Sequence, residues 1–114
     1  LNSQVIVEST QEFDLDAFLM DLIQRLHARL LSSNAEAAHL KVIGLCDGSY
    51  AVANLVSNFT GPELSLASNS RTLSANVVVN ARVATDPAEL ETIVREELAA
   101  AAAAVGVSQN VISL

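Results

Sequence analysis

The chain has 114 residues, about half of them apolar, and a formal net charge of −7 from 13 acidic and 6 basic side chains. This length is typical of a single domain, here residues 1–114, that buries a core without disulfides or a metal ion. The negative field and the scattered basic residues disfavour nucleic acid and anionic membrane surfaces as partners.

A strand at residues 4–8 and a helix at residues 15–31 open the predicted structure. Asp14 is a typical N-cap for this helix, and Phe13 can pack against Phe18 across the cap. Apolar residues recur at intervals of three and four, which predicts one buried stripe. Its members are Leu15, Phe18, Leu19, Leu22, Ile23, Leu26 and Leu30.

Residues 39–46 and 49–57 predict a β-hairpin, because Asp47-Gly48 between two apolar runs favours a turn with both residues at positive φ. The turn sets the register of the two strands. One face pairs Leu45 with Tyr50, Ile43 with Val52, Lys41 with Asn54 and His39 with Val56. The other face pairs Gly44 with Ala51, Val42 with Ala53 and Leu40 with Leu55. This second face is apolar and small, so a helix can approach it closely.

Residues 58–72 are rich in Ser, Asn, Gly and Pro, which indicates a long loop with one short strand at residues 63–66. Residues 73–83 alternate in polarity and predict a long strand. Its apolar face consists of Leu73, Ala75, Val77, Val79, Ala81 and Val83.

A second helix is predicted to start at Asp86, because Pro87 follows this cap and Glu89 stands three residues after it. The helix runs to about Val105 and ends at Gly106. Its expected buried residues are Leu90, Ile93, Val94, Leu98, Ala101, Ala102 and Val105. Residues 107–113 form a last strand.

Two βαβ units with a further strand between them indicate an α+β fold. We expect an α/β two-layer sandwich in which a mixed sheet carries both helices on one face. The order βαβ-β-βαβ is ferredoxin-like in character.

The sheet face opposite the helices is the candidate binding surface. Its polar residues are His39, Lys41, Asn54, Asn76, Asn80 and Arg82. Ile43, Val52 and Val78 lie among them. A solvated face is one interpretation, and a docking surface for a second copy or another domain is another. A small anion held by Lys41 and Arg82 is a third.

We predict no catalytic residue, no metal site and no cofactor. His27, His39 and Cys46 lack the spacing of metal ligands, and the sequence sets no base beside Cys46. Asp14 and Asp16 are explained by the dipole of the first helix. The chain has no glycine-rich loop of the kind that binds phosphates.

We expect a cytoplasmic location. The single cysteine, Cys46, excludes an internal disulfide and is typical of a reducing compartment. The apolar run at residues 98–105 is too short to span a bilayer, and no signal peptide opens the chain.

The loop at residues 58–72 supports an alternative function, a small-molecule-binding regulatory domain with a pocket under this loop. A plain surface connector is the competing interpretation. The polar residues that could line such a pocket are Ser65, Ser68, Asn69, Ser70 and Arg71.

Two stretches carry a resemblance to a known family. The first, Phe13 to Val56, contains Leu15-Asp16-Ala17-Phe18, Ala38-His39-Leu40-Lys41-Val42 and Ala51-Val52-Ala53-Asn54-Leu55-Val56. The second is Val79-Asn80-Ala81-Arg82-Val83 with Asp86-Pro87-Ala88-Glu89-Leu90. They resemble a segment beyond the nucleotide-binding domain of some CobW-type GTPases, the cobalamin-synthesis-related, metal-handling family.

The resemblance implies an accessory or regulatory domain beside cobalamin or other metal-cofactor metabolism. The family's P-loop and cysteine-rich metal motif are absent here, so no GTPase or metal-binding residue carries over. We therefore expect a non-catalytic domain that docks through its open sheet face. Its expected partner is a second copy, giving a homodimer, or a GTPase-type domain.

Overall fold

Eight elements follow one another along the chain in the computed structural model, which describes residues 1–33, 35, 37–56, 60–106 and 108–113. They are β1 (Asn2–Asp14), α1 (Leu15–Ser32), β2 (Ala37–Cys46), β3 (Ser49–Leu55), β4 (Glu63–Leu66), β5 (Arg71–Val83), α2 (Pro87–Val105) and β6 (Ser108–Ser113). Both predicted helices and all the predicted strands are present. The first strand is much longer than residues 4–8.

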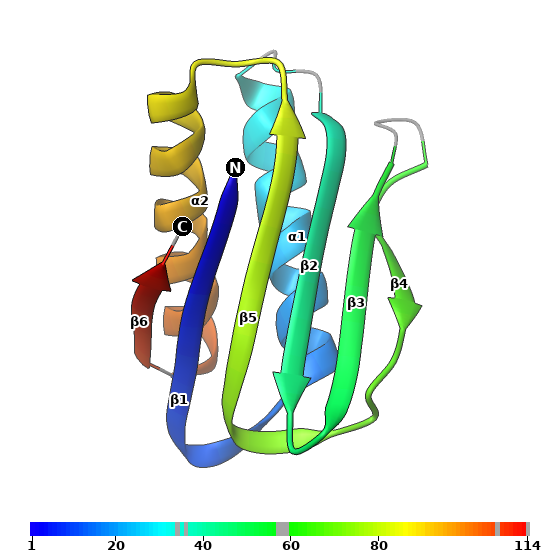
Figure 1. Ribbon diagram of the computed structural model, residues 1–114, viewed down its shortest axis with the longest axis vertical. Helices are drawn as coiled ribbons and strands as arrows, with labels where there is room; N and C mark the ends of the chain where they lie inside the picture. Colours follow the sequence, from blue (N-terminus) through cyan, green and yellow to red (C-terminus); the bar gives the residue numbers. More distant parts are fainter. Residues whose placement is uncertain (34, 36, 57–59, 107, 114) are drawn as a thin grey trace.

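The strands form one sheet in the order β4-β3-β2-β5-β1-β6. Figure 1 shows this sheet face-on, with α1 and α2 together behind it. The predicted α+β two-layer sandwich is therefore confirmed. The predicted mixed sheet is wrong, because all five strand pairings are antiparallel.

The two helical crossovers explain the antiparallel sheet. β1 and β2 run in the same direction, but β5 lies between them and pairs with both. β5 and β6 are likewise separated by β1. Each βαβ unit is thus split by a strand of the other unit, which is the ferredoxin-like arrangement. β3 and β4 extend the sheet beyond β2.

The β2–β3 hairpin has the predicted turn. Asp47 and Gly48 have φ angles of 47° and 78°, as a two-residue hairpin turn requires. The register agrees with the prediction from Leu45 opposite Tyr50 to Leu40 opposite Leu55. β3 ends at Leu55, so the predicted pairing of His39 with Val56 does not form part of the ladder.

The capping residues predicted for α1 and α2 are found at the ends of these helices. Asp14 accepts a hydrogen bond from the Ala17 N–H at 3.0 Å, and the Phe13 and Phe18 rings meet edge to face at 5.9 Å. Asp86 caps α2, and Gly106 ends it in the left-handed conformation.

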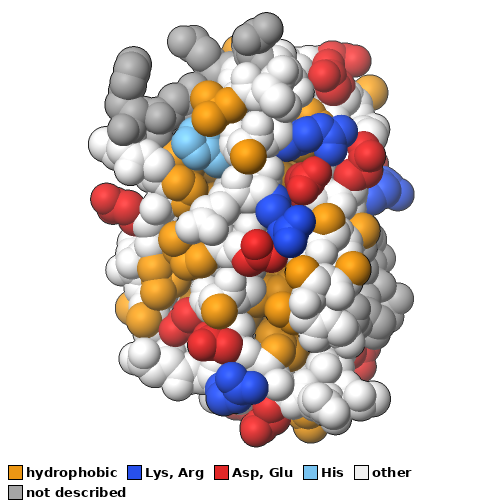
Figure 2. Space-filling view, turned by 180° about the vertical axis from the view of Figure 1, so that it is seen from behind, with side chains coloured by type: hydrophobic (Ala, Val, Ile, Leu, Met, Phe, Trp, Pro, Cys, Tyr) orange, Lys and Arg blue, Asp and Glu red, His pale blue; other side chains and the backbone are white. Residues whose placement is uncertain are grey.

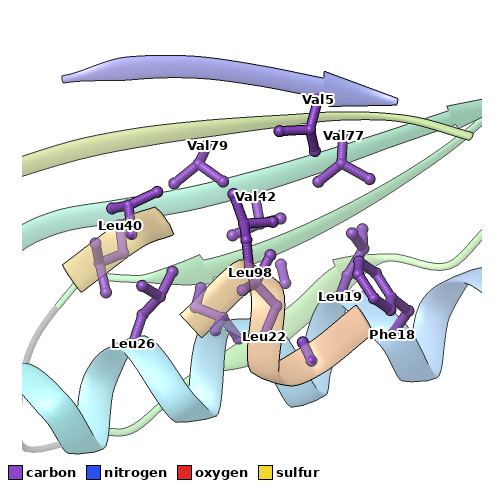
Figure 3. Close-up of a cluster of buried hydrophobic side chains, with 14 of the residues drawn as sticks. Val5, Phe18, Leu19, Leu22, Leu26, Leu40, Val42, Val77, Val79 and Leu98 are labelled. Carbon is purple, nitrogen blue, oxygen red and sulfur yellow. The ribbon is translucent and has the colours of Figure 1, made fainter. Parts of the chain in front are cut away.

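The core lies between the sheet and the helices, where aliphatic side chains from both layers interdigitate (Figure 3). Gly44 on β2 lets α1 approach closely, since a Cβ atom there would lie 2.8 Å from Cδ1 of the buried Leu15. Among the described residues, no helix has the combined length and apolar character that crossing a membrane requires.

Two residues predicted to be buried are exposed. Leu73 is 50% exposed, because the alternation of β5 is interrupted where the Thr72 hydroxyl donates to the Ser74 carbonyl at 2.8 Å. Thr72 takes the inward position instead. Val105 is 44% exposed. It is the last residue of α2, and the described elements do not cover it.

Candidate functional site

The sheet has one face that the helices leave uncovered, which we term the open sheet face. Strand alternation builds it, because the inward neighbours of its residues are buried in the core. Its side chains come from β1, β2, β3 and β5, and from β4 at the sheet edge. They are Asn2, Gln4, Ile6, Glu8, His39, Lys41, Ile43, Leu45, Tyr50, Val52, Asn54, Glu63, Leu66, Ser74, Asn76, Val78, Asn80 and Arg82.

The open sheet face contains all six residues singled out from the sequence, and four of them cluster. His39 lies opposite Arg82, and Lys41 lies opposite Asn80, on the paired strands β2 and β5. Asn54 is the neighbour of Lys41 on the other side, and its amide donates to Ser65 Oγ at 2.6 Å.

Asn76, the sixth residue, stands apart from this cluster. It lies opposite Leu45 on one side and opposite Ile6 on the other, nearer the β2–β3 turn. It therefore shares the face with His39, Lys41, Asn80 and Arg82 without joining their cluster.

An open depression of about 560 Å³ lies at the end of the face that His39 and Arg82 occupy, the upper end in Figure 1. Its lining residues are Leu1, Asn2, His39, Lys41, Val78, Asn80, Ala81 and Arg82. The sequence could not reveal this depression, because it forms only where β5 is inserted between β1 and β2.

Three arginines of the two helices form ion pairs with carboxylates of the same two helices. Arg29 binds Glu96 at 3.1 Å and Glu97 at 2.9 Å, and these bonds raise its pKa. Arg25 with Asp21 and Arg95 with Glu91 form the other two ion pairs there, at 2.9 and 2.7 Å. Figure 2 shows basic and acidic side chains side by side across this surface.

Lys41 and Arg82 form no ion pair with any residue that the structure describes. They lie on neighbouring strands, and His39 lies beside them. We term these three residues the basic end. In a protein with net charge −7, unpaired cations gathered on one face are suited to contact an anionic group.

The middle of the open sheet face is apolar. Ile43 lies opposite Val78 on one side and Val52 on the other, and all three are partly exposed. We term these residues the apolar centre. Tyr50 and Leu66 add further apolar surface and are 54% and 50% exposed.

The end of the face opposite the basic end is acidic. Glu8 lies beside Ser74 on the neighbouring strand, and Asp47 is exposed in the β2–β3 turn. We term Glu8, Ser74 and Asp47 the acidic end. Arg71 is the cation nearby, and its guanidinium donates to the Glu12 carbonyl at 3.0 Å.

The loop before β5 is anchored to α1. The Asp16 carboxylate accepts from the Ser68 N–H at 3.0 Å, the Ser68 hydroxyl at 2.7 Å and the Asn69 N–H at 2.8 Å. Burial raises the pKa of Asp16, but these hydrogen bonds outweigh it and hold the pKa below its ordinary value. The sequence assigned Asp16 only to the helix dipole and missed this anchor.

The pocket expected under residues 58–72 does not coincide with the depression. Ser65 bonds to Asn54 and to the Val52 carbonyl, and Ser70 donates to the Ser68 carbonyl. The side chains of Ser65, Ser68, Ser70 and Arg71, which were expected to line a pocket, instead form hydrogen bonds within the fold. Residues 58 and 59 of this segment lie outside the described part of the chain.

The candidate metal ligands lie apart. Cys46 is buried on the inward side of β2, whereas His39 lies on the open sheet face. Nε2 of His27 is buried without a hydrogen-bond partner in the described structure. In the ranges that the structure describes, no three His, Cys, Asp or Glu side chains come together as a metal site.

Comparisons of the chain with protein-family models, curated proteins and solved structures find no match. Function is therefore inferred from the open sheet face, which combines an apolar centre with a basic end and an acidic end. Burial of apolar surface favours association, and charges that match those of a partner determine its identity and orientation.

Proposed function

We propose that this chain is a non-catalytic docking module that binds a protein partner through its open sheet face. One observation carries the proposal. Ile43, Val52 and Val78 form a continuous apolar centre across three strands, and no described element covers it. Covering such surface removes apolar area from water, which favours association.

The surroundings of the apolar centre favour a protein over a lipid surface. Polar side chains such as Asn54, Asn76 and Asn80 border it, as in the polar rim of a protein interface. Lys41 and Arg82 favour a partner that presents carboxylates at the basic end.

The resemblance to CobW-type GTPases supports a cytoplasmic role beside cobalamin or metal-cofactor metabolism. It supports two partners, a second copy of this chain and a GTPase-type domain. In either case the chain contributes a surface and the partner contributes the chemistry.

Sedimentation velocity tests the proposal, with the chain alone and in a mixture with a CobW-type P-loop GTPase domain. Ile43→Lys and Val78→Lys each introduce a charge at the apolar centre, while Gln24→Lys does so at an exposed position of α1. We expect the first two changes to abolish association and the third to preserve it. Association that survives both changes, or its absence in both samples, contradicts the proposal.

A second candidate function is a regulatory domain that binds a small anionic molecule. The depression at the basic end favours it, since His39, Lys41 and Arg82 line a single volume of about 560 Å³. Thermal unfolding with inorganic phosphate, nucleotides and cobalamin precursors tests this candidate. A ligand at one hundred times its Kd adds about 2.7 kcal/mol to the free energy of unfolding, and unchanged Tm values across the panel count against it.

A further inference from the structure

We infer that the partner is a second copy of this chain, packed face to face and end for end on the open sheet face. The inference rests on the proposed function and specifies its partner. The open sheet face has opposite charges at its two ends and an apolar centre between them, an arrangement that is complementary to itself.

The two charged ends are equally far from the centre. On β5, Arg82 lies four residues from Val78 in one direction, and Ser74 lies four residues away in the other. Four strand residues span about 13 Å. Glu8 is the cross-strand neighbour of Ser74. The acidic end therefore lies as far from the level of Val78 as the basic end does.

A two-fold axis in the sheet plane, perpendicular to the strands at Val78, exchanges the two ends. It brings Arg82 of the second copy over Ser74, beside Glu8. The axis also brings His39 of the second copy over Asp47. On β2, His39 lies at the level of Arg82. Asp47, two residues beyond Leu45, lies at the level of Ser74, because Leu45 pairs with Asn76.

Both ends of the interface then contain the same contacts, Arg82 beside Glu8 and His39 over Asp47, repeated by symmetry as a two-fold interface requires. The apolar centres meet on the axis, where an interface is driest.

The charges disfavour a face-to-face dimer whose two-fold axis runs parallel to the strands. An axis parallel to the strands along β5 would leave the basic ends of both copies at the same end of the interface, with Arg82 over its own counterpart. Like charges in an interface disfavour association and select against such an arrangement. The end-for-end arrangement is therefore the one that the charges favour.

The size of the face fits a dimer. The molecule measures 37 × 25 × 22 Å along its principal axes, and Figure 1 views the sheet along the shortest of these. The two longer dimensions limit the face to roughly 900 Å² per copy, which is close to the roughly 800 Å² that each partner buries in an interface of standard size.

Two charge-reversed variants test the arrangement by sedimentation equilibrium. The basic-end variant carries Lys41→Glu with Arg82→Glu, and the acidic-end variant carries Glu8→Lys with Ser74→Lys. Each variant alone places like charges at both contacts, so we expect its dimer to dissociate at least about tenfold more readily than the wild type, which corresponds to about 1.4 kcal/mol.

An equimolar mixture of the two variants restores opposite charges at both contacts. We expect it to form a heterodimer with a dissociation constant within about threefold of the wild-type value, a change of less than 1.4 kcal/mol. Arg95→Glu, a reversal on the exposed surface of α2, should leave the wild-type dimer unchanged. Urea unfolding of each variant verifies that it is folded, and the single changes Arg82→Glu and Ser74→Lys replace any double variant that is not.

The remaining outcomes overturn the inference. A mixture that stays monomeric rules out the end-for-end contact. A basic-end variant that binds wild type more tightly than wild type binds itself indicates the opposite stacking. A wild type that stays monomeric but binds the GTPase-type domain through the open sheet face refutes the second copy and leaves the docking module intact. A wild type that binds neither refutes both.

Discussion

The two faces of the sheet come from the same strands but differ in what contacts them. On β5, Val77 and Val79 are fully buried against the helices, whereas Val78 between them is partly exposed. The inward face consists largely of small and aliphatic residues, while the outward face mixes aliphatic, amide and charged side chains. One face therefore stabilises the fold, and the other is available to bind a partner.

The same contrast holds for charge. In the helix layer, the cations Arg25, Arg29 and Arg95 are each held by a carboxylate. On the open sheet face, Lys41 and Arg82 have no such pairing among the described residues. The arginines of the helix layer are thus paired, whereas the two cations of the basic end are not paired with any carboxylate that the structure describes.

The largest effect should come from introducing the same charge on either face of β5. Val79→Lys buries an ammonium in the core without a partner, so we expect a loss of more than about 4 kcal/mol of unfolding free energy. Val78→Lys directs the ammonium to solvent and should change the stability of the monomer by about 0.5 kcal/mol or less. Urea unfolding at low protein concentration measures both. Equal losses would contradict the assignment of the two faces.

Gly44→Val should be next in size. The new side chain would collide with Leu15, which is fully buried and packed against β2. Overpacking of this kind costs about 1–3 kcal/mol. The outward neighbour provides the control, since Ile43→Val removes one partly exposed methyl group and should cost about 1 kcal/mol at most. Chemical unfolding compares the two variants. If Gly44→Val left the free energy of unfolding unchanged, α1 would not need the close approach to β2.

Asp16→Ala should lower the free energy of unfolding by about 1.5–2 kcal/mol, because it removes the charged acceptor of three hydrogen bonds. The effect should depend on pH. The pKa of Asp16 in the folded protein lies below its ordinary value of 3.8, so the stabilisation is present above about pH 4 and is lost as the pH falls further.

Urea titrations at pH 7 and pH 2 measure this dependence, and we expect the difference between wild type and Asp16→Ala to shrink at pH 2. Asp21→Ala is the matched control on the same helix. Its carboxylate pairs with Arg25 at a partly exposed site, so the loss should be smaller. A difference for Asp16→Ala that is independent of pH would contradict the anchor.

The smallest effect is expected for Arg29→Gln. It removes the contacts of an exposed guanidinium with Glu96 and Glu97, and surface ion pairs of this kind are weak and screened by salt. Thermal unfolding at low and high salt should show a small decrease in Tm that disappears in 1 M salt. A larger decrease than for Asp16→Ala would reverse the proposed ranking of these two side chains of α1.

The local elements could be predicted because their signals are local. Asp47-Gly48 set the hairpin register within a few residues, and the caps at Asp14 and Asp86 set where each helix begins. The sheet order could not be predicted, because the insertion of β5 between β1 and β2 pairs residues that are 31 to 78 positions apart in the chain. The parallel neighbours expected from each βαβ unit were wrong for this reason.

The candidate site was predicted in part for the same physical reason. Strand alternation was sufficient to assign His39, Lys41, Asn80 and Arg82 to one face. Their meeting around one depression depends on the pairing of β2 with β5, which no local pattern encodes. The irregularity at Thr72, which exposes Leu73, accompanies a register shift between β1 and β5 that alternation cannot foresee.

The central claim is that the open sheet face binds a second copy of the chain. Its most direct test is sedimentation velocity of wild type and Val78→Lys side by side over a wide range of concentration. We expect the wild type to rise from 12.0 kDa toward twice this mass and Val78→Lys to remain at 12.0 kDa. A wild type that stays at 12.0 kDa throughout, or a Val78→Lys variant that associates equally well, would contradict the claim.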